Sequence, residues 1–140
     1  IHSDYCRPNV LMVGDRVSGV LDFEFAGHDV RAMDLAAGLY HFGFVTGEDY
    51  LDMDWDVIGA FCTGYAAEVR LDRIEVELLP TLLRLRRAVS LTHRAGRWRA
   101  GLTPERTVRW QAGDMLALDE WLKTHSRTLV ASTYTWLHTQ

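Results

Sequence analysis

The sequence predicts a mainly α-helical domain that begins with a short β-hairpin. Two short runs of β-branched and apolar residues lie within the first 21 positions, separated by a turn that contains glycine. Beyond residue 30, apolar residues recur at intervals of three and four, which is the period of an amphipathic helix. No repeat, linker or low-complexity segment interrupts the 140 residues. We therefore expect residues 1–140 to form a single domain, long enough to bury a sizeable core.

The hairpin is expected at residues 10–13 and 17–21, which read Val-Leu-Met-Val and Val-Ser-Gly-Val-Leu. Residues 14–16, Gly-Asp-Arg, supply the turn between them. A helix should follow at 32–44, because these residues are mostly strong helix formers. A second helix is expected at 55–69, where one amphipathic stripe holds Ile58, Phe61, Cys62, Tyr65 and Val69.

Two longer helices should complete the domain. The first spans 74–100, with a single apolar stripe made of Leu78, Leu82, Leu85 and Val89. Pro80 cannot donate a backbone hydrogen bond, so it should mark the first turn or a kink of this helix. Thr103, Pro104 and Glu105 form a favourable start for the last helix, which we expect to run to about residue 123. The mixed residues 124–140 predict only a partial helix.

Charge is distributed unevenly along the chain. Residues 1–69 carry 3 basic and 12 acidic side chains, whereas 70–109 carry 10 basic and 4 acidic ones, and all ten basic residues are arginine. The acidic half favours a metal ion or a cationic substrate as a partner. The arginines of 84–109 alternate with leucines at helical spacing. We interpret them as a solvated helix face paired with carboxylates rather than as a nucleic-acid site, and expect no nucleic-acid partner.

The cellular location is predicted from weaker signals in the sequence, namely its apolar runs and its cysteines. No apolar run approaches the roughly 20 residues that a membrane span requires, so no membrane partner is expected. Two cysteines, Cys6 and Cys62, are too few for a disulfide framework and lack the spacing of a zinc site. A cytoplasmic location is therefore the prediction. Because Ile1 stands directly against the densest motif of the sequence, we also expect the chain to be a fragment.

The first 22 residues contain a set of side chains suited to phosphoryl transfer: His2-x-Asp4-x4-Asn9, then the hairpin, then Asp22. In this chemistry a hydroxyl nucleophile must be oriented and deprotonated while Mg²⁺ neutralises charge on the phosphates. A loop carboxylate such as Asp4 can accept the proton. The amide oxygen of Asn9 and the carboxylate of Asp22 are hard ligands of the kind that Mg²⁺ takes, and the hairpin would bring them to neighbouring strand ends.

This spacing resembles the catalytic loop and the metal-binding aspartate of the protein-kinase-like fold. The segment Val20-Leu-Asp-Phe-Glu-Phe-Ala-Gly27 resembles the ID(W/F)E segment of the aminoglycoside phosphotransferases, and Arg31-x-x-Asp34-Leu-Ala resembles their P-x-x-D-L-A helix start. Residues 78–86 are similar to a helix of type II homoserine kinases, and choline kinases share the fold. The specific part of the resemblance covers residues 1–36. It implies the C-terminal catalytic lobe of the protein-kinase-like fold.

The resemblance also implies roles for individual residues. Asp4 matches the catalytic base, Asn9 and Asp22 match the metal ligands, and His2 matches a histidine of the catalytic set that braces the loop. Ser3 stands where the family usually has glycine, which puts the loop backbone under restraint because only glycine samples positive φ at little cost.

Two further acids receive supporting roles. Asp34 matches a structural acid that ties the loop to the first helix through hydrogen bonds. Glu24 has two open interpretations, a second layer around the metal or a surface or capping position.

The implied activity is ATP-dependent (or GTP-dependent) transfer of the γ-phosphate, with Mg²⁺, to a hydroxyl of a small substrate such as an aminoglycoside, homoserine or choline. Such a site also needs a phosphate-binding loop and a lysine from an N-terminal lobe, whereas the sole lysine here is Lys123. We therefore expect the N-terminal lobe of the parent chain as a partner, a fragment inactive by itself, and self-association through the uncovered surface. The alternative is a non-catalytic pseudokinase or binding scaffold of the same fold.

Other chemistry-bearing residues receive plainer interpretations. Cys6 lies inside the motif, but no paired histidine supports a nucleophilic role. The aspartates of 49–56 could line the entrance for a cationic substrate, and a solvated segment capping the next helix is the favoured interpretation. Four tryptophans are expected in the core or in a covered interface: Trp98, Trp110, Trp121 and Trp136.

Overall fold

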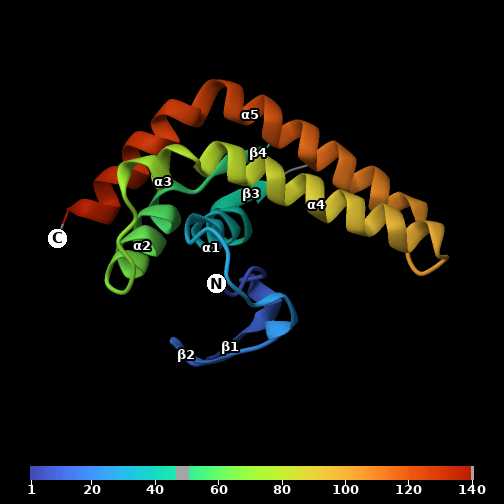
Figure 1. The fold of residues 1–140 in the computed structure, drawn as a ribbon, viewed down its shortest axis with the longest axis horizontal. Helices are drawn as coiled ribbons and strands as arrows, with labels where there is room; N and C mark the ends of the chain where they lie inside the picture. Colours follow the sequence, from blue (N-terminus) through green and yellow to red (C-terminus); the bar gives the residue numbers. More distant parts are fainter. Residues whose placement is uncertain (47–50, 140) are drawn as a thin grey trace.

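The computed structural model describes residues 1–46 and 51–139 (Figure 1). The described part contains two antiparallel two-stranded sheets, five α-helices and three short helical turns of other types. In chain order these are η1 (Arg7–Asn9), β1 (Val10–Val13), β2 (Arg16–Val20), η2 (Phe23–Phe25), α1 (Ala32–Gly38), η3 (Leu39–Gly43), β3 (Phe44–Thr46), β4 (Leu51–Met53), α2 (Trp55–Ala66), α3 (Arg73–Glu77), α4 (Leu79–Arg99) and α5 (Glu105–His138). A mainly helical chain with a hairpin near its start is confirmed. The small β3–β4 pair was not predicted.

The predicted hairpin is present. Strands β1 and β2 pair antiparallel from Val10 opposite Val20 to Val13 opposite Arg16, with an irregularity after Leu11. Gly14 lies in the turn with φ +61°, a left-handed conformation that favours glycine. The hairpin lies apart from the helices (Figure 1), and most of its apolar side chains are exposed to solvent.

The helix expected at 32–44 is shorter than predicted. Helix α1 ends at Gly38, the chain widens into a π-helical turn over Leu39–Gly43, and Phe44 begins β3. Close packing against α2 explains the two glycines. A Cβ atom at Gly38 would lie 2.1 Å from the ring of Phe61, and one at Gly43 would lie 1.9 Å from Ile58. Helix α2 therefore approaches Gly38 and Gly43 more closely than a side chain at either position would permit.

The amphipathic helix predicted at 55–69 forms as α2, although it ends at Ala66. Asp54 caps its start by accepting a hydrogen bond from the Val57 N–H over 3.1 Å. Ile58 and Cys62 of the predicted stripe are fully buried.

The helix expected at 74–100 is divided in two at Leu78. Short helix α3 begins with a capping box in which Asp72 and Glu75 bond each other's backbone N–H. Pro80 lies in the first turn of α4, where its missing N–H costs nothing, and this prediction is confirmed.

The apolar stripe predicted for this helix was largely wrong. Of its four members only Leu82 is buried, whereas Leu78, Leu85 and Val89 are exposed. The buried face lies one residue away and contains Leu79, Leu83 and Arg87 at four-residue intervals. An arginine interrupts the apolar pattern of this face, and that hid its true position in the sequence.

The last helix is longer than predicted. Helix α5 continues without interruption to His138, so the partial helix expected beyond residue 123 is a complete one. Leu129, Thr133 and Leu137 are buried at intervals of four along this tail. Its many threonines lower the intrinsic helix propensity, and packing against α2 outweighs that preference.

The core lies where α1, α2, α4 and α5 meet. Helix α5 runs antiparallel to α4 and then continues over α2 and α3 (Figure 1). Trp121 is buried in this core and Trp136 packs against it. Trp98 and Trp110 are not core residues, because 43% and 62% of their surfaces are exposed. None of the described helices is long and apolar enough to cross a membrane.

Candidate active site

The loop that carries the predicted motif is held by one carboxylate of α1. Both oxygens of Asp34 accept hydrogen bonds from the loop backbone, from the N–H of His2 and the N–H of Ser3, each over 2.8 Å. Ser3 has φ +68°, the left-handed conformation that a serine adopts only at a cost. The two bonds from Asp34 hold the loop in this conformation.

His2 joins the loop to the end of the second strand. Its Nδ1 accepts a hydrogen bond from the Asp4 N–H over 3.2 Å, and its Nε2 lies 2.9 Å from the carbonyl oxygen of Leu21. The two contacts together require a neutral ring that carries its proton on Nε2. The imidazole therefore spans the distance between Asp4 and the residue that precedes Asp22, and both of its nitrogens are engaged.

The carboxylate of Asp4 is held from two sides. Its Oδ1 accepts an ion-paired hydrogen bond from Nη2 of Arg86 over 2.5 Å. Its Oδ2 accepts a longer bond of 3.3 Å from Nδ2 of Asn9, and the same nitrogen donates to the Asp4 carbonyl over 3.0 Å. About 31% of the Asp4 side chain remains exposed, so the carboxylate is oriented and still accessible to a small molecule.

Asn9 and Asp22 lie on adjacent strand ends. The Leu21 N–H donates to the carbonyl oxygen of Asn9 over 2.8 Å, which places Asp22 immediately beyond this pairing. Asp22 is exposed and has φ +65°, so its backbone is strained at the position where the sequence predicts a metal ligand. The side-chain amide nitrogen of Asn9 is bonded to Asp4, whereas its side-chain oxygen Oδ1 accepts no hydrogen bond among the described residues.

This donor set fits Mg²⁺. Magnesium takes one or two protein oxygen ligands and keeps several waters, which matches one amide oxygen and one exposed carboxylate. Within residues 1–46 and 51–139, no three His, Cys, Asp or Glu side chains cluster closely enough to hold a metal ion by themselves. The oxygen atoms of Asn9 and Asp22 are donors of the type that Mg²⁺ takes, whereas zinc sites use clustered His and Cys ligands.

Glu24 stands apart from the other predicted residues. It lies in the exposed turn η2, just after Asp22. The structure thus brings together His2, Asp4, Asn9 and Asp34 through direct hydrogen bonds and places Asp22 beside them. Glu24 shares their neighbourhood in the sequence without such a bond among the described residues.

Arg86 was predicted to lie on a solvated helix face, but it contacts the loop of the motif. Besides the ion pair with Asp4, the Arg86 guanidinium donates to the Ser3 carbonyl oxygen over 2.5 Å and lies 3.2 Å from Nε2 of His41. Burial, together with the positive charge of Arg86, lowers the pKa of His41 to about 4. The imidazole is therefore neutral near pH 7 and accepts a bond from the arginine. Helix α4 is in this way connected directly to the predicted base.

The neighbouring Arg87 makes a second, deeper contact that was also missed. Its guanidinium pairs with the carboxylate of Asp114 from α5 and lies 4.2 Å from the ring centre of Tyr40. The Tyr40 hydroxyl donates to the same carboxylate over 2.6 Å. Burial and this bond strongly raise the pKa of Tyr40. The signal in the sequence was an arginine in register with Leu79 and Leu83, since a charge on a buried stripe requires a buried partner.

The remaining candidates follow the plainer interpretations where the structure describes them. Cys6 is buried and unpaired, and burial and the nearby Asp4 charge raise the pKa of its thiol, which disfavours the nucleophilic thiolate. Asp54 caps α2, and the Asp52 carboxylate accepts a bond from Trp121 over 3.4 Å. Asp49 lies outside the described residues.

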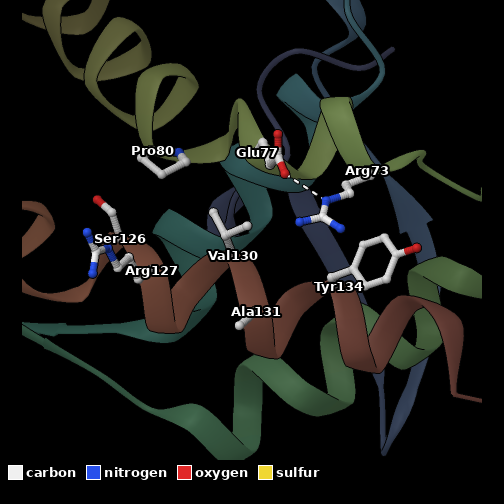
Figure 2. Close-up of a pocket in the computed structure, with 8 residues that line it drawn as sticks. All are labelled: Arg73, Glu77, Pro80, Ser126, Arg127, Val130, Ala131 and Tyr134. Carbon is white, nitrogen blue, oxygen red and sulfur yellow. Dashed lines mark hydrogen bonds and ion pairs between the residues drawn. The ribbon is translucent and has the colours of Figure 1, made fainter.

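Three hollows are relevant to the location of a ligand, and the smallest of them, of about 390 Å³, is lined by His2 and Asp34 below the loop. One, of about 520 Å³, is lined by Asp4 and by the middle of α4. Another, of about 560 Å³, lies between α3, the start of α4 and the C-terminal half of α5 (Figure 2). The latter is lined by the Arg73–Glu77 ion pair, Arg127 and Tyr134, and it contains none of the predicted motif residues. The hollow of about 520 Å³ contains Asp4, the predicted base.

Comparison with known proteins agrees with this geometry. Residues 1–69 match the model of the phosphotransferase enzyme family, and the matched segment contains the whole motif from His2 to Asp34. The chain belongs to the phosphotransferase enzyme family. The specific resemblance seen in the sequence is thereby confirmed at the level of the family.

Relatives of this chain include several bacterial homoserine kinases. One from Methylorubrum populi is 33% identical over 136 residues, which cover 97% of this chain and 40% of that protein. One from Methylobacterium sp. is 34% identical over the same extent, and one from Chelativorans sp. is 38% identical over 84 residues. The chain thus spans about 40% of the length of the curated relatives that it matches most fully. No solved structure matches it.

Proposed function

We propose that the protein to which this chain belongs transfers the γ-phosphoryl group of ATP (or GTP) to the hydroxyl of a small substrate. The observation that carries the proposal is the Asp4 carboxylate, oriented by Asn9 and Arg86 beside the strand ends that bear Asn9 and Asp22. Among the acceptors considered (an aminoglycoside, homoserine or choline), we favour homoserine because several relatives of the chain are homoserine kinases.

In this proposal Asp4 is the general base. The acceptor hydroxyl approaches the exposed side of the carboxylate and gives up its proton to it as the oxygen attacks the terminal phosphorus. The bond from that phosphorus to the bridging oxygen breaks, and the nucleoside diphosphate leaves. The Oδ2 atom suits this step better than Oδ1, because Oδ1 is ion-paired with Arg86 whereas Oδ2 has only the long bond from Asn9. His2 positions the loop and moves no proton, since both of its nitrogens are already bonded.

Asn9 and Asp22 would hold Mg²⁺ through the amide oxygen and the carboxylate. When bound, the ion supplies positive charge that neutralises the phosphates of the nucleotide. The strained backbone of Asp22 is consistent with a position fixed by function, and aspartate tolerates the left-handed region better than most residues. Asp34 serves as the structural acid below the loop. We assign Glu24 to the residues that surround the metal ligands, because it lies in the turn that follows Asp22.

The proposal extends to the rest of the molecule. We propose that residues 1–140 form the C-terminal catalytic lobe of a protein-kinase-like fold and that an N-terminal lobe of the parent chain supplies the phosphate loop and the lysine. The greater length of the relatives and the exposed apolar side chains of the β1–β2 hairpin support this. Without that lobe the chain should be inactive and should self-associate. A cytoplasmic location is part of the proposal, supported by two cysteines that remain unpaired.

The test is a phosphotransfer screen of the full-length protein with ATP or GTP, with Mg²⁺, and with L-homoserine, choline and an aminoglycoside as acceptors. We expect phosphate transfer to homoserine and little transfer to the two cations. Transfer to choline or the aminoglycoside instead would refute the assignment of homoserine as the acceptor. If no phosphate were transferred to any of the three acceptors and neither Mg²⁺ nor ATP were bound, the kinase proposal would be refuted and a non-catalytic scaffold favoured.

A further inference from the structure

The hollow beside Asp4 is lined on one side by polar side chains of α4. It occupies about 520 Å³ between the middle of α4 and the segment from Phe25 to Met33. Four polar side chains of α4 line it, namely Arg86, Ser90, His93 and Arg94. Their spacing of four, seven and eight residues places them on one face of the helix. A volume of this size is in the range of small-molecule sites and accommodates a small amino acid with several waters.

Of the charged side chains that line this hollow, two form an ion pair with each other and two form none within the described residues. Arg86 is committed to Asp4. Arg94 is exposed, and among residues 1–46 and 51–139 it forms no ion pair with an acidic side chain. Asp29, across the hollow, accepts a bond from the Val30 N–H over 2.7 Å and has no cationic partner in the same described ranges. One guanidinium and one carboxylate therefore remain for a ligand.

A ligand that satisfies both groups carries a negative and a positive charge. A polycation such as an aminoglycoside, or the quaternary amine of choline, would meet an unpaired guanidinium on the wall opposite Asp29. An amino acid with a side-chain hydroxyl would present its carboxylate to the arginine, which binds carboxylates in a forked geometry, and its ammonium to the aspartate.

The dimensions agree with such a ligand. Arg94 follows Arg86 by eight residues, so the two backbones are about 12 Å apart along α4. Side chains on a helix tilt toward its N-terminus, and Asp4 lies at the Arg86 end of this hollow, on the N-terminal side of Arg94 along α4. Asp4 and Arg94 line the same hollow of about 520 Å³, so one ligand in this space can contact both the carboxylate and the guanidinium.

We propose that this hollow is the acceptor site and that Arg94 is a specificity-determining residue that binds the carboxylate of the acceptor, with Asp29 facing its ammonium group. The inference rests on the proposed function for its reaction, and it names the residues that select the substrate.

The experiment compares the full-length wild-type protein with Arg94→Ala and with Arg99→Ala. Arg99 is the matched control, because it lies on the same helix, is exposed and does not line the hollow. Three acceptors separate the charges: L-homoserine, 4-hydroxybutyrate, which keeps the carboxylate, and 3-aminopropan-1-ol, which lacks it. Binding of L-homoserine is measured by calorimetry alongside the KM and kcat of each acceptor and the KM of the nucleotide.

Loss of a charge-assisted bond should raise the Kd and KM for L-homoserine in Arg94→Ala by about 10- to 100-fold. The KM for 4-hydroxybutyrate should rise similarly. The KM for 3-aminopropan-1-ol and for the nucleotide should not change, and Arg99→Ala should match wild type. Homoserine binding that depends on Arg94 without any phosphate transfer would sink the proposed function and support the acceptor site. Unchanged homoserine affinity, a rise confined to the nucleotide KM, or an equal effect on 3-aminopropan-1-ol would overturn the inference.

Discussion

The buried cluster of Arg87, Asp114 and Tyr40 allows the sharpest test of how the fold supports the site. Asp114→Ala removes the carboxylate that pairs with the guanidinium and accepts the Tyr40 hydroxyl. The side chains of Arg87 and Asp114 are only 6% and 5% exposed, so water cannot replace the lost partner. Arg87 Nε already has no hydrogen-bond partner within the described residues. The variant would leave a buried charge uncompensated.

The expected cost follows from that geometry. Removing one partner of a buried ion pair typically destabilises a protein by about 3–5 kcal/mol. Replacing both partners with apolar residues of similar volume is often close to neutral. The double variant Arg87→Met/Asp114→Leu should therefore recover most of the loss, apart from about 1–2 kcal/mol for the Tyr40 hydroxyl left without an acceptor.

Urea unfolding followed by circular dichroism measures both variants. A midpoint shift at constant slope reports a change in stability. Arg109→Gln is the control, because its ion pair with Glu105 is largely exposed and its removal should leave the midpoint nearly unchanged. If Asp114→Ala cost less than about 1 kcal/mol, or if the double variant were no more stable than the single one, the argument from burial would be refuted.

Three further predictions concern His41, the loop and the metal ligands. The pKa of His41 is lowered to about 4 from 6.5, so the unfolded chain binds the proton more readily and the free energy of unfolding should fall as pH drops from 6.5 towards 4. The same pH titration of His41→Gln should show a shallower fall, and identical slopes would contradict the assignment. Ser3→Gly should raise the free energy of unfolding by about 0.5–1 kcal/mol because glycine adopts φ +68° without strain, whereas a lower urea midpoint would argue that the serine is not strained. Asp22→Ala in the full-length protein should abolish Mg²⁺-dependent transfer and weaken Mg²⁺ binding, and retention of either would exclude Asp22 as a metal ligand.

Local patterns in the sequence were sufficient to predict the hairpin and to identify the residues of the motif. The turn at residues 14–15 and the strands beside it depend on neighbours in the chain, and so does the position of Pro80 in the first turn of α4. The family resemblance depended on residues 1–36, where short spacings are fixed by chemistry. These features need few distant contacts to form.

What escaped prediction depends on distant contacts. Arg86 and Asp4 are separated by 82 residues, and Arg87 meets Asp114 of the next helix. Sequence periodicity treats an arginine as a solvated residue, so it placed the apolar stripe of α4 on the wrong face. The tail of α5 was underestimated for a related reason, because its helical state rests on packing against α2 rather than on helix propensity.

The central claim is that Asp4 is the catalytic base, and the most direct test is the turnover of the full-length Asp4→Asn protein. Asparagine keeps the size of the side chain and cannot accept the hydroxyl proton. We predict that kcat for homoserine falls by about 10²–10⁴-fold, while the KM for the nucleotide changes little. A kcat within a few-fold of wild type would contradict the assignment of the base and, with it, the proposed mechanism.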